Sequence, residues 1–427
     1  MSIESRSFST DELVLGMYVS GLDRPWTETP FLFQGFHIES PKVIKELRRY
    51  CKFVYVDIEK SDDTIAFIAR QAPPPRRKSE GGDSEPRMAA SPKTEAPDLH
   101  AIEGEESARE TTTLKAELVD AELVHRQTER VIEDLFARIR SGESIEIGDV
   151  EQALDPMLDS IIRNDHAMSW LARMRKKNDY VHDHSIASSV WAMIFGKHLG
   201  LKSEDLQILG IGAVFMDVGK TRIPTEYLIK RETLSPEEMG LMKRHVSYGV
   251  EIVSALDGID PRVVEMVRCH HERHNGTGYP EGLTGVDIPI FSRIAGIVDA
   301  YDAMTTQRPY AEAVSTFDAM RQLNNLAGVE FAAEMVEQFV QAIGVFPVGT
   351  LVELSTGEVG VVIAQNRIRR LRPKVMLLLD SDKKPIETTP IVDLRNQLAD
   401  SRGENSLWIE TGLPPGAYGL DAREYYL

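Results

Sequence analysis

CHHERHNGTGYP, residues 269–280, places two adjacent histidines directly before a glycine-rich run. The Asp260-Pro261 pair upstream suits the start of a helix, with Asp as N-cap and Pro at the first helical position. Glycine permits backbone angles that a helix does not use, so the run after the histidines is expected to end this helix. His270 and His271 are therefore predicted on a last helical turn that opens into an exposed loop. Such a position suits a metal ion beside a substrate, although two surface histidines before a turn would give the same pattern.

Length and composition limit the kind of protein that this chain can be. Its 427 residues are too many for one typical domain and suggest two or three. A hydrophobic fraction of 42% is enough for packed cores. The formal net charge of −18 repels polyanions at long range, which argues against binding of nucleic-acid polymers. A small phosphate ligand is compatible with this charge, because a local cation site can overcome the overall field.

The cysteines and the N-terminus indicate a compartment. Cys51 and Cys269 are the only two cysteines, so both are expected to be ordinary thiols of a reducing environment. The N-terminal sequence MSIESRSFST lacks the basic-then-apolar pattern of a signal peptide. No apolar run reaches the roughly 18 residues that span a bilayer. We therefore expect a cytoplasmic protein with no membrane segment.

Residues 1–70 are expected to form a small α+β accessory domain without catalytic residues. The sequence predicts strands over Leu13–Val19, Phe31–Ile38 and Phe53–Ile58. A helix is predicted over Ser40–Tyr50.

Residues 71–113 differ in composition from their surroundings. Three prolines and a short basic run open the segment, and a mixture of Ser, Glu, Gly and Ala follows. Few large apolar side chains are present, so the segment cannot bury enough surface to offset its ordering entropy. We predict a flexible linker, in which the basic run is a solvated charge cluster rather than a nucleic-acid patch.

Residues 114–345 are predicted to form a helical domain with an N-terminal helical preface. Leu114–Arg140 carries apolar residues at helical spacing, and a second helix is expected over Val150–Arg163. This preface would either pack within its own chain, which is the commoner outcome, or form the seam of a homodimer. Six or more helices are expected after Ala167. Serines are predicted as N-caps at three helix starts: Ser203, Ser235 (in a capping box with Glu238) and Ser315. Loops are expected at Arg222–Thr233 and Asn275–Pro289.

Residues 346–400 change to apolar, β-branched segments typical of strands. Strands are predicted over Leu351–Leu354, Gly360–Ala364 and Val375–Leu379, with a hairpin turn at Thr356-Gly357. Residues 401–427 are left as a tail. The predicted fold class is therefore mainly α: an all-helical domain preceded by a small α+β domain and followed by a small antiparallel β appendage.

Histidines and aspartates recur within apolar helical stretches of the central domain. The candidates are His184, Asp217, His245, His270, His271, Asp299 and Asp302. A buried, unpaired carboxylate is costly, so each aspartate should have a partner, and a cation is one solution. Imidazole and carboxylate ligands suit divalent ions such as Fe, Mn, Co, Ni or Zn. The alternative is that these groups are buried and satisfied by ordinary hydrogen bonds.

Residues 180–323 resemble the HD-GYP family of metal-dependent phosphodiesterases, which hydrolyse cyclic di-GMP. The matching pieces, in order, are HS at 184–185, DVGK at 217–220, IP at 223–224, His245 with Gly249, HHER at 270–273, GTGYP at 276–280, GL at 282–283, IP at 288–289, SRI at 292–294, VDAYDAM at 298–304 and RPY at 308–310. The N-terminal segment resembles a small domain that often precedes HD-GYP domains, through GMYV, LDRPW, FQGF and VYVD.

This resemblance implies an all-helical HD-type domain with one or two metal ions, Fe, Mn or similar. Residue by residue, it implies a first metal on His184, Asp217 and Asp299. It implies a second metal on His245, His270 and His271, with Asp217 as the bridge. The resemblance also makes Asp217 and Lys220 the catalytic pair. Substrate contacts would come from Lys220, Tyr279 and Arg308, although ion pairing or packing would also explain these three.

The sequence departs from the family at several positions. The His of the His-Asp pair is Met216, and a thioether is a poor ligand for hard divalent ions. Tyr180 stands where members with a third metal carry Glu, so a trinuclear centre is not expected. Asn275 replaces a usual Asp, and Ala311 stands where many members place a Lys that helps to hold the substrate.

These features lead to a leading hypothesis and two alternatives. The first is a cyclic di-GMP phosphodiesterase of second-messenger signalling that yields linear pGpG and, in a further step, GMP. The second is a module that binds cyclic di-GMP or a protein and has lost turnover through Met216. The third is another metal-dependent phosphohydrolase, acting on a nucleotide or a phosphate monoester. Expected partners are cyclic di-GMP, signalling proteins that dock on the GYP loop (the loop that contains GTGYP, residues 276–280) or on the N-terminal domain, and a second copy of the chain.

Overall fold

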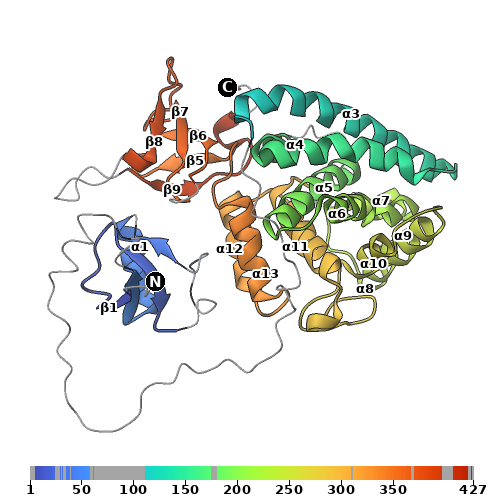
Figure 1. Ribbon diagram of the computed structural model, residues 1–427, viewed down its shortest axis with the longest axis horizontal. Coiled ribbons are helices and arrows are strands. Elements are labelled where there is room, and N and C mark those ends of the chain that lie inside the picture. Colours follow the sequence, from blue (N-terminus) through green and yellow to red (C-terminus); the bar gives the residue numbers. More distant parts are fainter. Residues whose placement is uncertain are drawn as a thin grey trace, which may run out of the picture. The chain divides into compact units, whose positions relative to one another are not determined.

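The computed structural model divides the chain into two compact units (Figure 1). The first unit contains Met1–Trp26 and Gln34–Glu103, and the second contains Thr27–Phe33 and Gly104–Leu427. The structure describes residues 5–24, 29, 31, 35–38, 40–57, 61, 111–174, 180–308, 311–366, 370–396, 407–421 and 425. Most of the predicted linker, and the side chain of Tyr180, lie outside the described residues. The domain boundaries expected at residues 70, 113, 345 and 400 stay predictions.

Over its described residues, the first unit is a four-stranded antiparallel sheet with one helix. The strand order is β1-β4-β2-β3, made of β1 (Ser5–Ser9), β4 (Phe53–Asp57), β2 (Tyr18–Leu22) and β3 (Phe36–His37). Helix α1 (Pro41–Tyr50) begins after Ser40, whose hydroxyl accepts a hydrogen bond from the Val43 N–H. The predicted helix and the predicted strand at Phe53 are confirmed.

Two of the predicted strands in this unit are misplaced. The apolar run Leu13–Val19 was expected to be extended, but β2 begins only at Tyr18. Gly16 has a φ of +90°, which is outside the extended region, and its N–H donates to the Ile38 carbonyl, so the run before β2 turns. The strand predicted over Phe31–Ile38 is reduced to Phe36–His37, and Gly35 just before it has a φ of +103°.

The second unit opens with two long helices packed against each other. They are α3 (Leu114–Ser141) and α4 (Ile147–Arg173), so packing within the chain is confirmed. Helix α4 is longer than the predicted Val150–Arg163 because the chain passes through a kink and continues. At the kink, Asn164 has φ −160° and ψ 102°, and its amide donates to the Thr112 carbonyl while accepting from the His166 N–H.

An ion pair between a buried carboxylate and a half-buried guanidinium joins these two helices and gives a test of their packing. Glu117 on α3 accepts from the Arg163 guanidinium of α4 at 2.8–3.2 Å. Burial raises the pKa of the Glu117 carboxyl, but hydrogen bonds from Arg163, Ser160 and Thr112 outweigh it and lower the pKa.

We expect Glu117→Gln to lower the free energy of unfolding by about 1–2 kcal/mol at pH 7, the size of a charge-assisted hydrogen bond. Because the pKa of Glu117 is lower in the folded protein than in the unfolded one, the ion pair contributes its full stability above the unfolded pKa of about 4.3. This contribution is lost as the pH falls through the pKa of the folded protein. Thermal unfolding of both proteins from pH 7 to pH 3 should show the gap closing in acid. An equal gap across this range would contradict the ion-pair argument.

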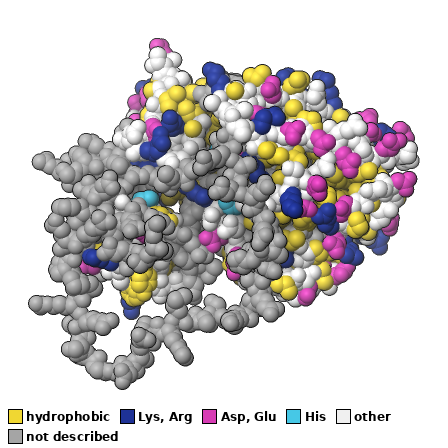
Figure 2. All heavy atoms as spheres, in the orientation of Figure 1, with side chains coloured by type: hydrophobic (Ala, Val, Ile, Leu, Met, Phe, Trp, Pro, Cys, Tyr) yellow, Lys and Arg dark blue, Asp and Glu magenta, His cyan; other side chains and the backbone are white. Residues whose placement is uncertain are grey.

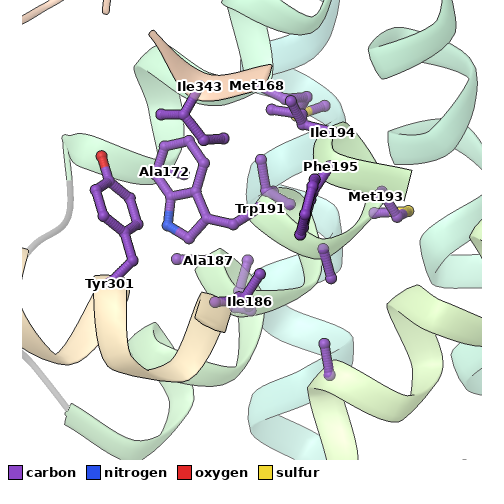
Figure 3. Close-up of a cluster of buried hydrophobic side chains, with 14 of the residues drawn as sticks. Met168, Ala172, Ile186, Ala187, Trp191, Met193, Ile194, Phe195, Tyr301 and Ile343 are labelled. Atoms are coloured by element: carbon purple, nitrogen blue, oxygen red, sulfur yellow. The ribbon is translucent and has the colours of Figure 1, made fainter. Parts of the chain in front are cut away.

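The remaining helices form the predicted all-helical domain. They are α5 (Tyr180–His198), α6 (Ser203–Phe215), η3 (Val218–Arg222), α7 (Thr225–Leu228), α8 (Pro236–Lys243), α9 (His245–Ser254), α10 (Pro261–Cys269), η4 (Gly285–Asp287), α11 (Ile290–Thr305), α12 (Thr316–Leu326) and α13 (Ala333–Ile343). Helix α5 packs against α4, α6, α11 and α13. Buried aromatic side chains such as Trp191, Phe195 and Tyr301 fill the space between these helices (Figure 3).

The predicted helix starts are confirmed with one exception. Ser235 forms the expected capping box with Glu238, and Ser315 accepts from the Asp318 N–H. Ser203 was expected to be an N-cap but is already helical; Lys202 precedes it and makes no side-chain cap. The two predicted loops contain short helical segments, α7 in the first and η4 in the second.

The C-terminal part is an antiparallel sheet of order β8-β7-β6-β5-β9. Its strands are β5 (Leu351–Leu354), β6 (Val359–Ala364), β7 (Lys374–Leu379), β8 (Ile391–Asp393) and β9 (Ile409–Gly412). Gly357 has a φ of +94° in the predicted hairpin between β5 and β6. Strand β9 pairs with β5, so the sheet takes in part of the segment that was left as a tail. The predicted fold class is confirmed.

The surface agrees with the acidic composition. Acidic side chains are spread over the visible face of the helical region among basic and apolar ones (Figure 2). Among the described residues, each helix is either too short or too polar to span a bilayer.

Candidate metal centre

The six predicted metal ligands come together in the helical domain as two overlapping groups. One group contains Asp217, His245, His270 and His271; the other contains His184, Asp217 and Asp299. In each group the ligand atoms lie within 4.8 Å of one another. Asp217 belongs to both groups, so one carboxylate joins them.

The ends of helices position most of these side chains. Asp217 lies in the short junction between α6 and η3, and His245 is the first residue of α9. His270 and His271 directly follow α10, whose start at Asp260-Pro261 is as predicted. His184 and Asp299 lie within α5 and α11. Because helix ends from distant parts of the sequence meet here, the site depends on tertiary packing.

Gly219 allows two of these elements to approach closely. A Cβ at Gly219 would lie 1.8 Å from the His245 carbonyl oxygen and 2.5 Å from the Gly249 nitrogen. Both neighbours are backbone atoms of α9, so no side-chain movement could relieve the overlap. The close contact between η3 and α9 therefore requires glycine.

Backbone carbonyls orient two of the imidazoles. His245 Nδ1 lies 2.7 Å from the Met242 carbonyl oxygen, and His270 Nδ1 lies 3.0 Å from that of Val267. A carbonyl only accepts, so each Nδ1 carries a proton and donates it. Each neutral ring then has its lone pair on Nε2, which lies 3.4 Å (His245) or 3.8 Å (His270) from Asp217 Oδ1.

His271 completes this group from the opposite side. Its Nε2 lies 3.1 Å from His245 Nε2, and its Nδ1 lies 3.8 Å from Asp299 Oδ2. Burial lowers the pKa of His245 to about 4 and lowers that of His271 well below its ordinary value. Both rings are therefore neutral at pH 7, which is the form that binds metal ions.

The carboxylates stay ionised despite their burial. Burial raises the pKa of Asp217, but the nearby Lys220 ammonium and the surrounding imidazoles outweigh it and hold the pKa well below its usual range. For Asp299, burial is likewise outweighed, here by His184 and His271, and the pKa falls. Lys220 forms an ion pair with Asp217 Oδ2.

These atoms fit a cation. His184 Nε2 lies 3.4 Å from Asp217 Oδ2 and 3.2 Å from Asp299 Oδ1, and all three residues are at least nine-tenths buried. Asp217 Oδ1 and His270 Nε2 are buried and have no hydrogen-bond partner among the described residues. Around Asp217 Oδ1, electron-rich atoms therefore converge without a hydrogen-bond donor between them, and such an arrangement needs a positive charge. Imidazole nitrogens and carboxylate oxygens are suitable ligands for first-row divalent ions.

The GYP loop covers one side of this cluster. The Tyr279 ring stacks on His271 with centroids 4.7 Å apart, and Lys243 Nζ lies 4.6 Å from the Tyr279 centroid. Burial and the charges of Asp299 and Asp217 raise the pKa of the Tyr279 phenol, so it stays protonated at neutral pH. Tyr279 is thus an aromatic face with a hydroxyl donor beside the candidate metal ligands.

Other singled-out positions differ in what the structure says of them. The Met216 side chain is fully buried and belongs to the hydrophobic core. Arg308 lies three residues after α11, in a short backbone bridge with Ala311. Asn275 accepts from the Thr277 backbone and hydroxyl, which shapes the turn before Gly278.

Three polar residues near the cluster had no predicted role: Asp302 was a candidate without an assigned role, and Glu272 and Lys243 were not candidates. Asp302 accepts from His184, Glu272 accepts from the backbone N–H groups of residues 281–283, and Lys243 lies over Tyr279. For Asp302 a signal existed, since it is one helical turn after Asp299 and shares its face. The partners of Glu272 and Lys243 lie across a loop whose path the sequence does not reveal.

Comparisons with known proteins agree with this arrangement. Three family profiles match in order: a domain of unknown function (DUF3391) over residues 5–150, an HD domain over 158–334, and a KOW domain associated with HD domain over 351–399.

Several curated relatives carry one activity in their names. The chain is 29% identical over 385 residues to the cyclic di-GMP phosphodiesterase PA4108 of Pseudomonas aeruginosa, a match that covers 90% of this chain and 87% of the relative. It is 35% identical to the cyclic di-GMP phosphodiesterase response regulator RpfG of Xanthomonas campestris, over 35% of this chain and 40% of that protein. It is 34% identical to a cyclic di-GMP phosphodiesterase of Thermotoga maritima, over 34% of this chain and 40% of that one. The chain thus carries an HD domain, with a DUF3391 domain before it and a KOW domain after it, and its HHER–GYP stretch and clustered imidazoles are similar to those of the HD-GYP family.

Proposed function

We propose that this chain is a metal-dependent phosphodiesterase that hydrolyses cyclic di-GMP to linear pGpG and, in a further step, to GMP. The observation that carries the proposal is the buried group of Asp217, His245, His270 and His271, in which acceptor atoms converge around a shared carboxylate. The names of the relatives, above all the one matched over 87% of its length, support the substrate.

The proposed ligand sets follow the two groups. His245, His270 and His271 would hold one cation together with Asp217, and His184 and Asp299 would hold a second on the other oxygen of Asp217. When bound, such cations lower the pKa of a coordinated water and neutralise the charge of the phosphodiester. We propose Fe or Mn, since mixed nitrogen and oxygen ligands suit these ions.

The two sites are chemically unequal. The group with three imidazoles and one carboxylate favours borderline ions, whereas His184 with two carboxylates offers mostly oxygen and suits harder ions such as Mn²⁺. Met216 brings no nitrogen to either group. We therefore propose that the three-imidazole site fills first and that the His184 site is the weaker one.

Three residues of the chain are proposed to act on the substrate. Lys220 forms its ion pair with Asp217 at the edge of the cluster, where its ammonium would contact a phosphate oxygen or protonate the leaving oxygen. Tyr279 would line the cleft with its ring face and hydroxyl. Arg308 would contact a second phosphate oxygen, a role supported by the family resemblance alone.

Product analysis tests the activity. Purified protein supplied with Mn²⁺ or, without oxygen, Fe²⁺ should convert cyclic di-GMP to pGpG, as followed by chromatography. GMP and p-nitrophenyl phosphate serve as monoester controls, and their faster hydrolysis would favour a different phosphohydrolase. Protein that contains the metal but forms no linear dinucleotide would rule out the proposed activity.

Met216 is the observation that favours the second candidate, a binding module without turnover. If the altered site works, Met216→His should strengthen cation binding at the weaker site by about 10–100-fold, while the turnover number at saturating Mn²⁺ changes only a few-fold. The buried imidazole should also lower the stability of the metal-free protein by about 1–3 kcal/mol. Calorimetric titration, thermal unfolding and turnover of both proteins measure these effects. A gain in turnover above about 100-fold at saturating metal would instead show that Met216 has disabled the natural chain.

Partners other than the nucleotide are proposed on narrower grounds. Helix α3 exposes Val119 and Leu123, with 68% and 56% of their surface accessible, which suits a second copy or another protein. Light scattering would detect a homodimer, and α3 variants with polar residues at these two positions would dissociate it. The GYP loop and the N-terminal domain (residues 1–70) are the other proposed docking sites for signalling proteins.

A further inference from the structure

Asp302 is a fully buried carboxylate that contacts one candidate metal ligand without being one itself. Its Oδ2 lies 2.7 Å from His184 Nδ1, and its Oδ1 accepts a 3.0 Å hydrogen bond from Trp191 Nε1. The exposed fraction of Asp302 is 0%. The Thr306 hydroxyl also donates to Oδ2, at 3.4 Å. A buried carboxylate is stable only when its oxygens are hydrogen-bonded or paired, and these contacts contribute to that.

The contact with Asp302 determines which nitrogen of His184 is available. An ionised carboxylate only accepts hydrogen bonds, so His184 Nδ1 must carry the proton that it shares with Oδ2. In the neutral ring, the lone pair then lies on Nε2, which lies 3.4 Å from Asp217 and 3.2 Å from Asp299. Asp299 and Asp302 are three residues apart on α11, so one face of this helix provides both a ligand and the group that orients the neighbouring ligand.

Trp191 in turn holds Asp302 in place. Its ring packs edge-on against Tyr301 with centroids 5.6 Å apart, and the Arg173 guanidinium lies 4.6 Å from the ring centroid. Figure 3 shows Trp191 between α5 and Tyr301 of α11, within the hydrophobic core. The hydrogen bond from the indole N–H to Oδ1 holds the Asp302 carboxylate with Oδ2 directed at His184 Nδ1.

We propose that Asp302 and Trp191 are positioning residues that fix the tautomer and direction of His184 and so set the affinity of the weaker metal site. The relevance of these residues to catalysis rests on the proposed function, but the quantity that they are predicted to set is the affinity of the site for metal. Carboxylates that hold a ligating histidine typically change metal affinity by about 10–100-fold. Since the His184 site has a single imidazole, the orientation of this ring matters more here than in the three-imidazole site.

The chain allows a test in which two substitutions should compensate. Asp302→Asn keeps the shape of the side chain but replaces one of its two acceptor oxygens with an NH₂ group, which donates. Its oxygen cannot serve both His184 and Trp191, and an amide N–H facing Nδ1 would move the His184 proton to Nε2. We expect Mn²⁺ binding at the weaker site to fall about 10–100-fold. Trp191→Phe keeps an aromatic ring and removes the competing N–H. In the double variant the amide oxygen can return to His184, so binding should recover at least about tenfold relative to Asp302→Asn.

Calorimetric titration with Mn²⁺ on the full chain measures both sites separately. The three-imidazole site serves as the internal control and should keep its affinity in all variants, which also shows that they fold. Wild-type affinity in Asp302→Asn, or a double variant that binds more weakly than Asp302→Asn, would overturn the inference. If the metal affinities change as expected but none of the proteins, including the wild type, hydrolyses cyclic di-GMP, the result would count against the proposed activity and still support the positioning role.

Discussion

Asp217→Asn is expected to abolish hydrolysis of cyclic di-GMP and to weaken both metal sites at once. Asp217 Oδ1 faces His245 and His270, whereas Oδ2 faces His184 and the Lys220 ammonium. An amide removes the negative charge and turns a donor toward one of these groups. Stabilisation by metal ions amounts to several kcal/mol, so kcat/KM should fall on the order of 10³-fold or more.

The comparison needs variants that separate the two groups. Asp299→Asn should weaken the His184 site much more than the three-imidazole site, because Asp299 belongs to one group and meets the other only through His271 Nδ1, 3.8 Å away. Asp257 is exposed and lies outside both groups, so Asp257→Asn controls for the general effect of removing a charge. If Asp217→Asn had wild-type turnover at saturating Mn²⁺, the shared carboxylate would not be needed for catalysis.

Gly219→Ala is expected to have the second largest effect, although it adds a single methyl group. The new Cβ would meet the His245 carbonyl oxygen at 1.8 Å, and neither backbone segment can move without shifting a metal ligand. Overpacking typically costs about 1–3 kcal/mol, and a clash with backbone belongs at or above the upper end. We expect a clear loss of thermal stability and at least a tenfold loss of Mn²⁺ affinity at the three-imidazole site.

Gly240→Ala is the matched control for this substitution. Gly240 lies in α8, and a Cβ there meets no atom within 4 Å. In a helix, alanine is more stable than glycine by about 0.5–1 kcal/mol, so this variant should melt slightly above the wild type with its metal binding intact. If both alanine variants bound Mn²⁺ like the wild type, the tight contact between η3 and α9 would not be needed for the site.

The sequence predicted those features of the fold that depend only on residues close together in the chain, such as the starts of helices. The capping box at Ser235 and the Asp260-Pro261 start are confirmed, since capping depends on the first turn alone. The backbone angle of a particular glycine was harder to predict, because glycine can adopt both negative and positive φ. Gly16 has a positive φ and bends an apolar run that otherwise suits a strand. Strand β9 was missed because it pairs with β5, which lies more than fifty residues earlier in the chain.

The candidate site shows the same division. The residue types and the resemblance predicted which six side chains would meet, and the structure brings them together. They did not predict what orients them, because the carbonyls of Met242 and Val267 have no side-chain signature. The proton on His184 is determined by Asp302 and Trp191, which come from different helices and meet only in the folded core.

The position of the bound cation is the most direct test of the central claim. A crystal of the chain grown with Mn²⁺ should show an anomalous difference peak within about 2.5 Å of Asp217 Oδ1 and the Nε2 atoms of His245 and His270. His271 should complete that ligand set. A protein that contains Mn²⁺ by elemental analysis, but whose anomalous peak lies elsewhere, would contradict the account.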